Sequence, residues 1–231
     1  MKRKINNEYK EFTDLLEFSN GKYNSIDVFR DFVVMFAIAI KNSIDYSQED
    51  EDAYLRITKK YEKSELKVFI ELYTKLLLIF IEKNEIKDVL GEIFHIIGAN
   101  SKAKSQFFTP MHIAKLMSAT IFTEDEIKNN DFISIRDPAC GSGVLLLSVA
   151  QHLNVNKIDY KCKILIEAQD VDFTCFCMAY IQLSLYRIPG RVILGNSLLN
   201  EKRKIFYTPE FFTGKWKEKI EERRKIKDGR I

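Results

Sequence analysis

Asp137-Pro138-Ala139-Cys140-Gly141-Ser142-Gly143 is a glycine-rich segment at the boundary between two sequence patterns. The apolar stretch Phe132-Ile133-Ser134-Ile135 before it is typical of a strand, and Val144-Leu145-Leu146-Leu147-Ser148-Val149-Ala150 after it is typical of a helix. A glycine turn between a strand and a helix brings bare backbone close to a ligand, and the helix N-terminus offers unpaired N–H groups to a carboxylate or phosphate. The segment therefore predicts a nucleotide-type pocket.

The spacing of the glycines narrows the choice of ligand. The dinucleotide fingerprint GxGxxG would need a third glycine where the chain has Leu146, and the P-loop lysine and hydroxyl are absent. Asp137 precedes the glycines, and Asp170 stands near the end of the next predicted strand. Two such carboxylates suit a ligand with a cationic amine and a ribose diol. S-adenosylmethionine has both groups and is the predicted cofactor.

Composition sets wide bounds. The chain has 231 residues, 46% of them hydrophobic, which suffices for one large or two small globular domains. The longest apolar runs, at 32–40 and 76–81, fall short of the ~20 residues of a membrane span, and no secretory signal pattern opens the chain. We expect a soluble, cytoplasmic protein that does not contact a membrane.

Cysteines and histidines give no sign of a metal site. The four cysteines lack the spacing of a disulfide framework, and no two of the three histidines stand at ligand spacing. We expect no metal and small buried thiols, with Cys140 present for its size beside the ligand rather than as a nucleophile. The cysteines are Cys140, Cys162, Cys175 and Cys177.

Two regions follow one another along the chain. Residues 1–100 have apolar positions at helical spacing and predict an α-helical N-terminal domain, with N-cap patterns at Ser47 and Ser64. Residues 101–200 alternate between helix and strand, which predicts an α/β domain with a parallel sheet. The predicted helices are 9–18, 28–40, 53–61, 66–81, 89–97, one from Pro110 through Met117, 143–152 and 173–185; the predicted strands are 132–135, 164–166 and 192–194.

Residues 201–231 form a basic C-terminal tail around Trp216. Such a patch is able to follow a phosphate backbone, and a solvated helix of mixed lysine and glutamate is the alternative. With only three predicted strands, an edge of the sheet would stay open. The tail, the helical domain or another chain would have to cover it.

Polar or glycine residues follow all three predicted strands, at 137–143, 169–172 and 195–197. In an open parallel sheet, ligands bind beyond the carboxyl ends of the strands. The coincidence of three polar strand ends therefore indicates one ligand site at that edge.

These segments resemble the N6-adenine DNA methyltransferases, especially the modification (M) subunits of type I restriction-modification systems. Gln106-Phe107-Phe108-Thr109-Pro110 is similar to their QFFTP signature, and DPACGSG at 137–143 to their main cofactor motif. Segment 88–94 resembles the helix that precedes QFFTP, and 169–172 and 195–199 stand in the places of the next two cofactor motifs. The resemblance covers residues 88–199 and implies a Rossmann-like S-adenosylmethionine-dependent methyltransferase domain with a truncated sheet.

The resemblance also implies roles for single residues. Thr109 and Pro110, with Phe108 beside them, would line the methionine end of S-adenosylmethionine. Asp137 and the backbone of Ala139, Cys140, Gly141 and Gly143 would hold its amino and carboxylate groups. Asp170 would take the ribose hydroxyls, Val171 would pack on the adenine, and Asn196 stands where relatives often place an aspartate that reads the adenine amine. Asn196-Ser197 is equally consistent with a simple turn.

One motif of the family is missing. Relatives hold the target adenine with [DNS]PP[YFW], whose polar group and carbonyl accept hydrogen bonds from the amine and whose ring stacks on the flipped base. None of the four prolines here is next to another, and Phe206-Tyr207-Thr208-Pro209-Glu210 reads as a turn before a helix. The residues that would position the adenine, and thus the catalytic residues, cannot be named.

Two functional hypotheses remain open. The first is a site-specific, adenine-specific DNA methyltransferase of restriction-modification type, which acts on DNA and whose missing adenine-binding motif would come from a second subunit. The alternative is a non-catalytic subunit that binds S-adenosylmethionine, DNA or both and lacks or borrows the motif. Retention of the cofactor motifs favours the enzyme, and loss of the adenine motif favours the subunit.

Overall fold

The structure is a computed structural model that describes residues 9–18, 21–81, 85–99, 109–121 and 124–227. Its first third is helical, as predicted, and the expected helices are all present with shifts of a few residues at their ends. They are α1 (Lys10–Leu15), α2 (Ser25–Asn42), α3 (Gln48–Thr58), α4 (Lys63–Ile81) and α5 (Val89–Ala99). Ser47 caps α3 by accepting a hydrogen bond from the Asp50 N–H, but Ser64 lies inside α4, which begins one residue earlier.

The sheet has four strands in the order β1-β2-β3-β4. β1 (Ile133–Asp137), β2 (Ile164–Asp170) and β3 (Gly190–Leu194) are parallel, which confirms the predicted strands and the α/β fold. β4 (Lys204–Tyr207) pairs antiparallel with β3. This strand comes from the segment that was predicted to be a basic tail, and it makes the sheet mixed.

In the described part of the chain, seven further helices accompany the sheet: α6 (Met111–Ile121), α7 (Glu124–Asn129), α8 (Val144–Val155), α9 (Tyr160–Lys163), α10 (Phe173–Leu185), α11 (Pro209–Thr213) and α12 (Trp216–Lys227). α6 begins after Pro110, whose carbonyl accepts from the Ile113 and Ala114 N–H groups. Pro209 opens α11 at the first helical turn, where a proline sacrifices no hydrogen bond.

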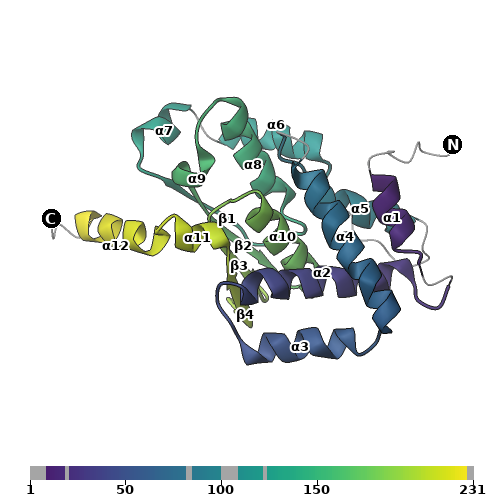
Figure 1. Cartoon of the computed structure of the whole chain (residues 1–231). Helices are drawn as coiled ribbons and strands as arrows, with labels where there is room; N and C mark the ends of the chain where they lie inside the picture. Colours follow the sequence, from purple (N-terminus) through teal and green to yellow (C-terminus); the bar gives the residue numbers. More distant parts are fainter. Residues whose placement is uncertain (1–8, 19–20, 82–84, 100–108, 122–123, 228–231) are drawn as a thin grey trace.

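One hydrophobic core joins the helical region to the first face of the sheet. That face carries Ile166, Ala168, Val192 and Phe206, all buried. α8 and α10 pack on the strands, and α2 packs in turn against α10. Figure 1 shows α2 and α4 on this side of the sheet and α11 and α12 on the other. The described helices α1 to α5 therefore share a core with the α/β region.

A buried ion cluster fastens α2 and α3 to β4. Asp50 of α3 receives Lys41 of α2, with 3.1 Å between Nζ and Oδ2, and Lys204 of β4 on its other oxygen. The side chains of Lys41 and Asp50 are 8% and 5% exposed. Burial alone would raise the pKa of Asp50, but the hydrogen bonds from Lys204 and Lys41 outweigh it and lower that pKa.

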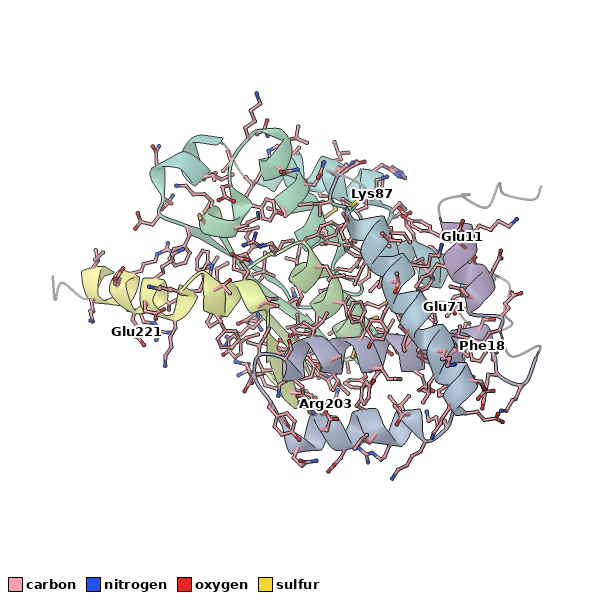
Figure 2. All side chains as sticks on the ribbon, viewed as in Figure 1. Glu11, Phe18, Glu71, Lys87, Arg203 and Glu221 are labelled. Carbon is pink, nitrogen blue, oxygen red and sulfur yellow. The ribbon has the colours of Figure 1, made fainter. Side chains whose placement is uncertain are left out.

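The second face of the sheet is polar and lies under the C-terminal helices. Glu167 of β2 bridges two arginines on the neighbouring strands, at 3.2 Å from Arg136 Nε and 2.7 Å from Arg191 Nε. Trp216 at the start of α12 is fully buried, and its ring meets that of Phe132 edge to face at 5.0 Å. Glu221 on α12 is exposed (Figure 2).

Two smaller expectations concern thiols and membranes. All four cysteines are free, and three are buried as predicted, whereas Cys162 is exposed because it lies on the short surface helix α9. Among the described helices, none combines the length and the apolar character that a bilayer crossing requires.

Candidate cofactor site

The glycine turn between β1 and α8 is held by its backbone. Gly141 and Gly143 have φ values of 56° and 97°, a left-handed conformation that side-chain-bearing residues rarely adopt. The Gly143 N–H donates to the Cys140 carbonyl at 2.8 Å, and the Cys140 N–H donates to the Gln169 carbonyl at 2.9 Å. The turn is thereby fixed to the end of β2, and α8 begins at Val144 with its first N–H groups free of intrahelical acceptors.

Asp137, the last residue of β1, has one oxygen in use and one without a partner. Oδ1 accepts from the Ala139 N–H at 3.1 Å. Oδ2 is buried and has no hydrogen-bond partner among the described residues. Burial raises the pKa of Asp137, the charge of Asp170 raises it further, and the Ala139 bond opposes both. A cationic ligand group at Oδ2 would satisfy that oxygen and offset the repulsion.

Asp170, the last residue of β2, lies against the same turn. Its Oδ2 accepts from the Gly141 N–H at 2.8 Å and its Oδ1 from the Asp172 N–H at 2.9 Å. The next residue, Val171, is 61% exposed although it is apolar. Its carbonyl accepts from Arg203, which is labelled in Figure 2, at 3.2 Å. The structure thus brings Asp137, the turn and Asp170 together, and leaves an apolar side chain open beside them.

Asn196, after β3, uses its side chain locally. Its Oδ1 accepts from the Leu198 N–H at 3.0 Å, and its own N–H donates to Glu201 at 3.0 Å. This is the turn that the sequence left as one of two options. Leu198 and Leu199 beyond it are 94% and 76% exposed, and no sequence pattern predicts apolar side chains open at this edge.

Cys140 is unsuited to nucleophilic chemistry. It is buried, and burial raises the pKa of its thiol well above the ordinary value, with the charges of Asp170 and Asp137 adding to the effect. The thiol therefore stays protonated near neutral pH, which agrees with a packing role. Ala139 beside it is exposed on the outer side of the turn.

The QFFTP segment is described only in part. Phe108 lies outside the described residues, so its predicted place at the cofactor stays a prediction. Thr109 is half-buried and Pro110 exposed, directly before α6. α6 packs along α8, and the Ser148 hydroxyl donates to the Ala114 carbonyl at 3.1 Å. Thr109 and Pro110 thus lie directly before the helix that packs along α8, the helix that follows the glycine turn.

Beneath the turn lies a buried carboxylate that sequence reasoning missed. Asp88 accepts from the Ser142 hydroxyl at 2.6 Å and from Gln182 Nε2 at 2.8 Å. Its Oδ1 also caps α5 by accepting from the Gly91 N–H at 3.0 Å. The spacing of Asp88 and Gly91 is a capping signal, but its contact with the turn joins residues 54 positions apart and cannot be read from local sequence.

Other candidate sites are weaker. No group of three or more His, Cys, Asp or Glu side chains in the described part of the chain is arranged to hold a metal ion. A cavity of about 930 Å³ lies between the second face of the sheet and α11 and α12, and its lining includes Arg136, Glu167, Arg191 and Arg223. None of the predicted cofactor residues lines it, so it is separate from the strand ends.

Comparison with known proteins gives one family. A model of the family described as N-6 DNA Methylase matches residues 85–229. The chain is also 27% identical over 128 residues to the type I restriction enzyme MjaIX methylase subunit of Methanocaldococcus jannaschii. That alignment covers 53% of this chain and 22% of the relative, so the chain spans about a fifth of that protein's length.

Comparison with solved structures gives two further matches. A putative class I S-adenosylmethionine-dependent methyltransferase from Listeria monocytogenes superposes with a TM-score of 0.50 at 16% identity, covering 84% of this chain and 55% of that one. A type I restriction-modification methyltransferase subunit from Streptococcus thermophilus gives a TM-score of 0.42 at 16% identity, covering 85% and 53%. The first likeness agrees with the α/β fold predicted from the alternating strands and helices.

Proposed function

The chain belongs to the N-6 DNA methylase family, and from this premise we propose that it is the S-adenosylmethionine-binding part of a DNA adenine methyltransferase of restriction-modification type. The observation that carries the proposal is the unpartnered, buried Oδ2 of Asp137 beside a left-handed glycine turn. A buried carboxylate oxygen is costly unless a donor satisfies it. The α-amine of S-adenosylmethionine is a cationic donor of the right kind.

The remaining residues fit the rest of that ligand. The N–H groups of Ala139, Cys140, Gly141 and Gly143 already donate within the protein, so we assign the ligand's carboxylate to the free N–H groups in the first turn of α8 beside this backbone. Asp170 keeps lone pairs for the ribose hydroxyls, because a carboxylate accepts about four hydrogen bonds and two are used. Val171 offers an exposed apolar side chain to the adenine. We assign Thr109, Pro110 and Phe108 to the methionine end. Asn196 has a weaker role at the adenine amine, because its amide oxygen already accepts a hydrogen bond within a turn.

The proposed acceptor is the exocyclic amine of adenine in DNA. When bound, S-adenosylmethionine would supply an electrophilic methyl group: the amine would form the new N–C bond as the S–C bond breaks, S-adenosylhomocysteine would leave and the amine would lose a proton, without a covalent enzyme intermediate. The chain has no [DNS]PP[YFW] motif, and Phe206 and Tyr207, its nearest candidate by position, lie in strand β4. Within the described residues β1 pairs only with β2, so its other edge is open next to Asp137. We propose that a second polypeptide supplies the motif there.

DNA is the proposed macromolecular partner, with α12 as a candidate contact. Its Lys217, Arg224 and Lys225 are exposed, as a phosphate-contacting surface requires. Two other cations of the helix are used within the protein: Lys219 lies over the Trp216 ring at 4.4 Å and Arg223 over the Phe132 ring at 4.5 Å. Two of these five cations thus lie over aromatic rings of the protein, and the three exposed ones also fit the solvated-helix alternative.

The second candidate function is a non-catalytic cofactor-binding subunit, favoured by the missing motif. Calorimetric titration with S-adenosylmethionine tests the pocket, and no binding at millimolar cofactor would overturn both candidates. Incubation with labelled cofactor and adenine-containing duplex DNA then separates them. Methyl transfer to adenine supports the enzyme, whereas tight cofactor binding without transfer supports the subunit. Adding a polypeptide that carries an NPP-aromatic segment tests whether transfer is restored in trans.

A further inference from the structure

Asp88 is an almost fully buried carboxylate, 4% exposed, at the junction between the helical region and the cofactor turn. Burial raises its pKa, whereas hydrogen bonds from Ser142, Gln182 and Gly91 and the charge of His95 oppose that rise. Burying a carboxylate costs free energy unless hydrogen-bond donors satisfy it, and three separate donors bond to this one. Capping of α5 does not explain why this carboxylate is buried, because an exposed aspartate would cap the helix as well.

The glycine turn is held from two sides. On the ligand side, the Gly141 N–H donates to Asp170 at 2.8 Å. On the inner side, the side chain of Ser142 is fully buried and its hydroxyl donates to Asp88 Oδ2 at 2.6 Å. Ser142 lies between the two left-handed glycines, so its orientation determines how the backbone on either side of it is presented.

Gln182 of α10 completes the attachment. Its Nε2 donates to Asp88 Oδ1 at 2.8 Å and to the Ser142 carbonyl at 2.9 Å, and its Oε1 accepts from the Leu90 N–H at 3.1 Å. One amide thus joins α10, the turn and the start of α5. Every hydrogen bond of this network is between buried groups, where loss of one partner leaves another unsatisfied.

Gly91 makes room for this arrangement. A Cβ built on Gly91 would lie 2.2 Å from Asp88 Oδ2 and 2.6 Å from its Cγ. Any side chain at this position would therefore push the carboxylate away from Ser142. The Asp88-Val89-Leu90-Gly91 sequence encodes both the cap of α5 and the space for its second role.

We infer that Asp88 is a positioning residue of the cofactor pocket: through Ser142 it holds the glycine turn in the shape that receives the methionine end of S-adenosylmethionine. This inference rests on the proposed function for its ligand. It also makes the start of α5, which precedes the α/β sheet in the sequence, part of the cofactor-binding unit.

The chain offers a matched control in Gln151 of α8. Its Oε1 accepts from the Ile86 N–H at 2.7 Å, so it anchors the same junction two residues away and is also buried. Gln151 is not a partner in the described hydrogen bonds that join Asp88, Ser142 and the turn. Gln151→Leu therefore loosens the junction without touching the turn. A merely structural Asp88 would behave in the same way as Gln151.

The experiment compares Asp88→Ala, Asp88→Asn, Ser142→Ala and Gln151→Leu by calorimetric binding of S-adenosylmethionine and of adenosine, below the unfolding temperature of each variant. We expect Asp88→Ala and Ser142→Ala to weaken S-adenosylmethionine binding about 10-fold, the loss of one well-made hydrogen bond, and to leave adenosine affinity within about 2-fold. Asp88→Asn should rescue affinity, because its amide is able to donate to the Ser142 hydroxyl while its oxygen accepts from Gly91.

Gln151→Leu should lower the unfolding temperature but leave the affinity for S-adenosylmethionine unchanged. Equal affinity losses in Asp88→Ala and Gln151→Leu, or none in Asp88→Ala, would overturn the inference. Hydrogen exchange of residues 137–147 without ligand provides a second readout: exchange should accelerate in Asp88→Ala and not in Gln151→Leu. If the unaltered chain binds no S-adenosylmethionine, the proposed function fails, and exchange alone decides whether Asp88 holds the turn.

Discussion

Asp137 shows how one side chain determines what the pocket accepts. One of its oxygens serves the turn, and the other is buried with no partner among the described residues. The nearby negative charge of Asp170 disfavours an anionic ligand group at this oxygen and favours a cationic one. We therefore expect the site to prefer a cationic ligand group to an anionic one of the same shape.

Asp137→Asn should weaken S-adenosylmethionine binding by about 10- to 100-fold, because a hydrogen bond to a charged group contributes roughly 1.5–3 kcal/mol. The asparagine keeps an oxygen for the Ala139 N–H, so the fold should be retained. Calorimetric titration measures the affinity, and circular dichroism checks the fold. An unchanged affinity in a folded variant would show that the cofactor amine binds elsewhere.

Affinity for the cofactor should also depend on pH through Asp137. Only the carboxylate form attracts the amine, and the pKa of Asp137 is raised by burial and by Asp170. Protonation therefore begins at a higher pH than the ordinary value of about 3.9, and affinity should fall as the pH is lowered through that raised pKa. Titrations from neutral pH downward test this. The same series on Asp137→Asn should lack that step; a step of equal size in both proteins would assign it to another group.

At the scale of elements, the pairing of β2 with β3 leaves no room for a side chain at Gly190. A Cβ added there would lie 2.2 Å from the Ile166 carbonyl oxygen, which belongs to the backbone and has little freedom to move. The glycine is thus required by strand pairing, since its φ is not in the left-handed region.

Gly190→Ala should lower the free energy of unfolding by about 1–3 kcal/mol, the usual cost of overpacking. Gly21→Ala is the control, because its added Cβ meets no atom within 4 Å and only strains the backbone at φ 90°. Urea unfolding of both variants gives the comparison. A smaller loss for Gly190→Ala than for Gly21→Ala would mean that the strands shift apart at little cost.

How far the sequence predicts these elements depends on whether the signal is local. The apolar stretches that form α8, α10 and the three parallel strands are each continuous in the sequence, so the local pattern predicts these elements. β4 was missed although Ile205, Phe206 and Tyr207 favour a strand, because the strand has only four residues and leads directly into Thr208-Pro209, which indicates a turn before a helix. It forms through pairing with β3 and through the ion pair of Lys204 with Asp50, 154 residues earlier. The contact of Asp88 with Ser142 was missed because it also joins residues that are far apart in the sequence.

At the scale of the whole molecule, the Asp50 cluster connects the first and last thirds of the chain. Asp50→Asn leaves Lys41 and Lys204 without their common carboxylate, and breaking a buried pair typically costs about 3–5 kcal/mol. The pKa of Asp50 is lowered in the folded state, so its contribution is present above the unfolded value and is lost as the pH falls through the folded one.

Urea unfolding of the unaltered chain and of Asp50→Asn, at neutral pH and near pH 3, measures this contribution. The variant should be less stable at neutral pH, and the difference between the two proteins should shrink in acid. Glu49→Gln is the control, because Glu49 contacts the same Lys204 but is 81% exposed, and exposed pairs contribute about 0–1 kcal/mol. A difference that does not change with pH would show that the charge of Asp50 is not what stabilises the junction.

The single tryptophan allows the unity of the fold to be tested. Trp216 is buried at the start of α12, on the far side of the sheet from the N-terminal helices, whose side chains share one core with α8, α10 and the strands. Because both layers pack on the same four strands, neither is expected to survive the loss of the other. Trp216 fluorescence and the helical circular dichroism signal should therefore change at the same urea concentration. Phe132→Leu, which removes the ring that Trp216 contacts at 5.0 Å, should move both transitions together to lower urea. If fluorescence changed first, α12 would be a separately docked element, and the sheet would be held by the helical side alone.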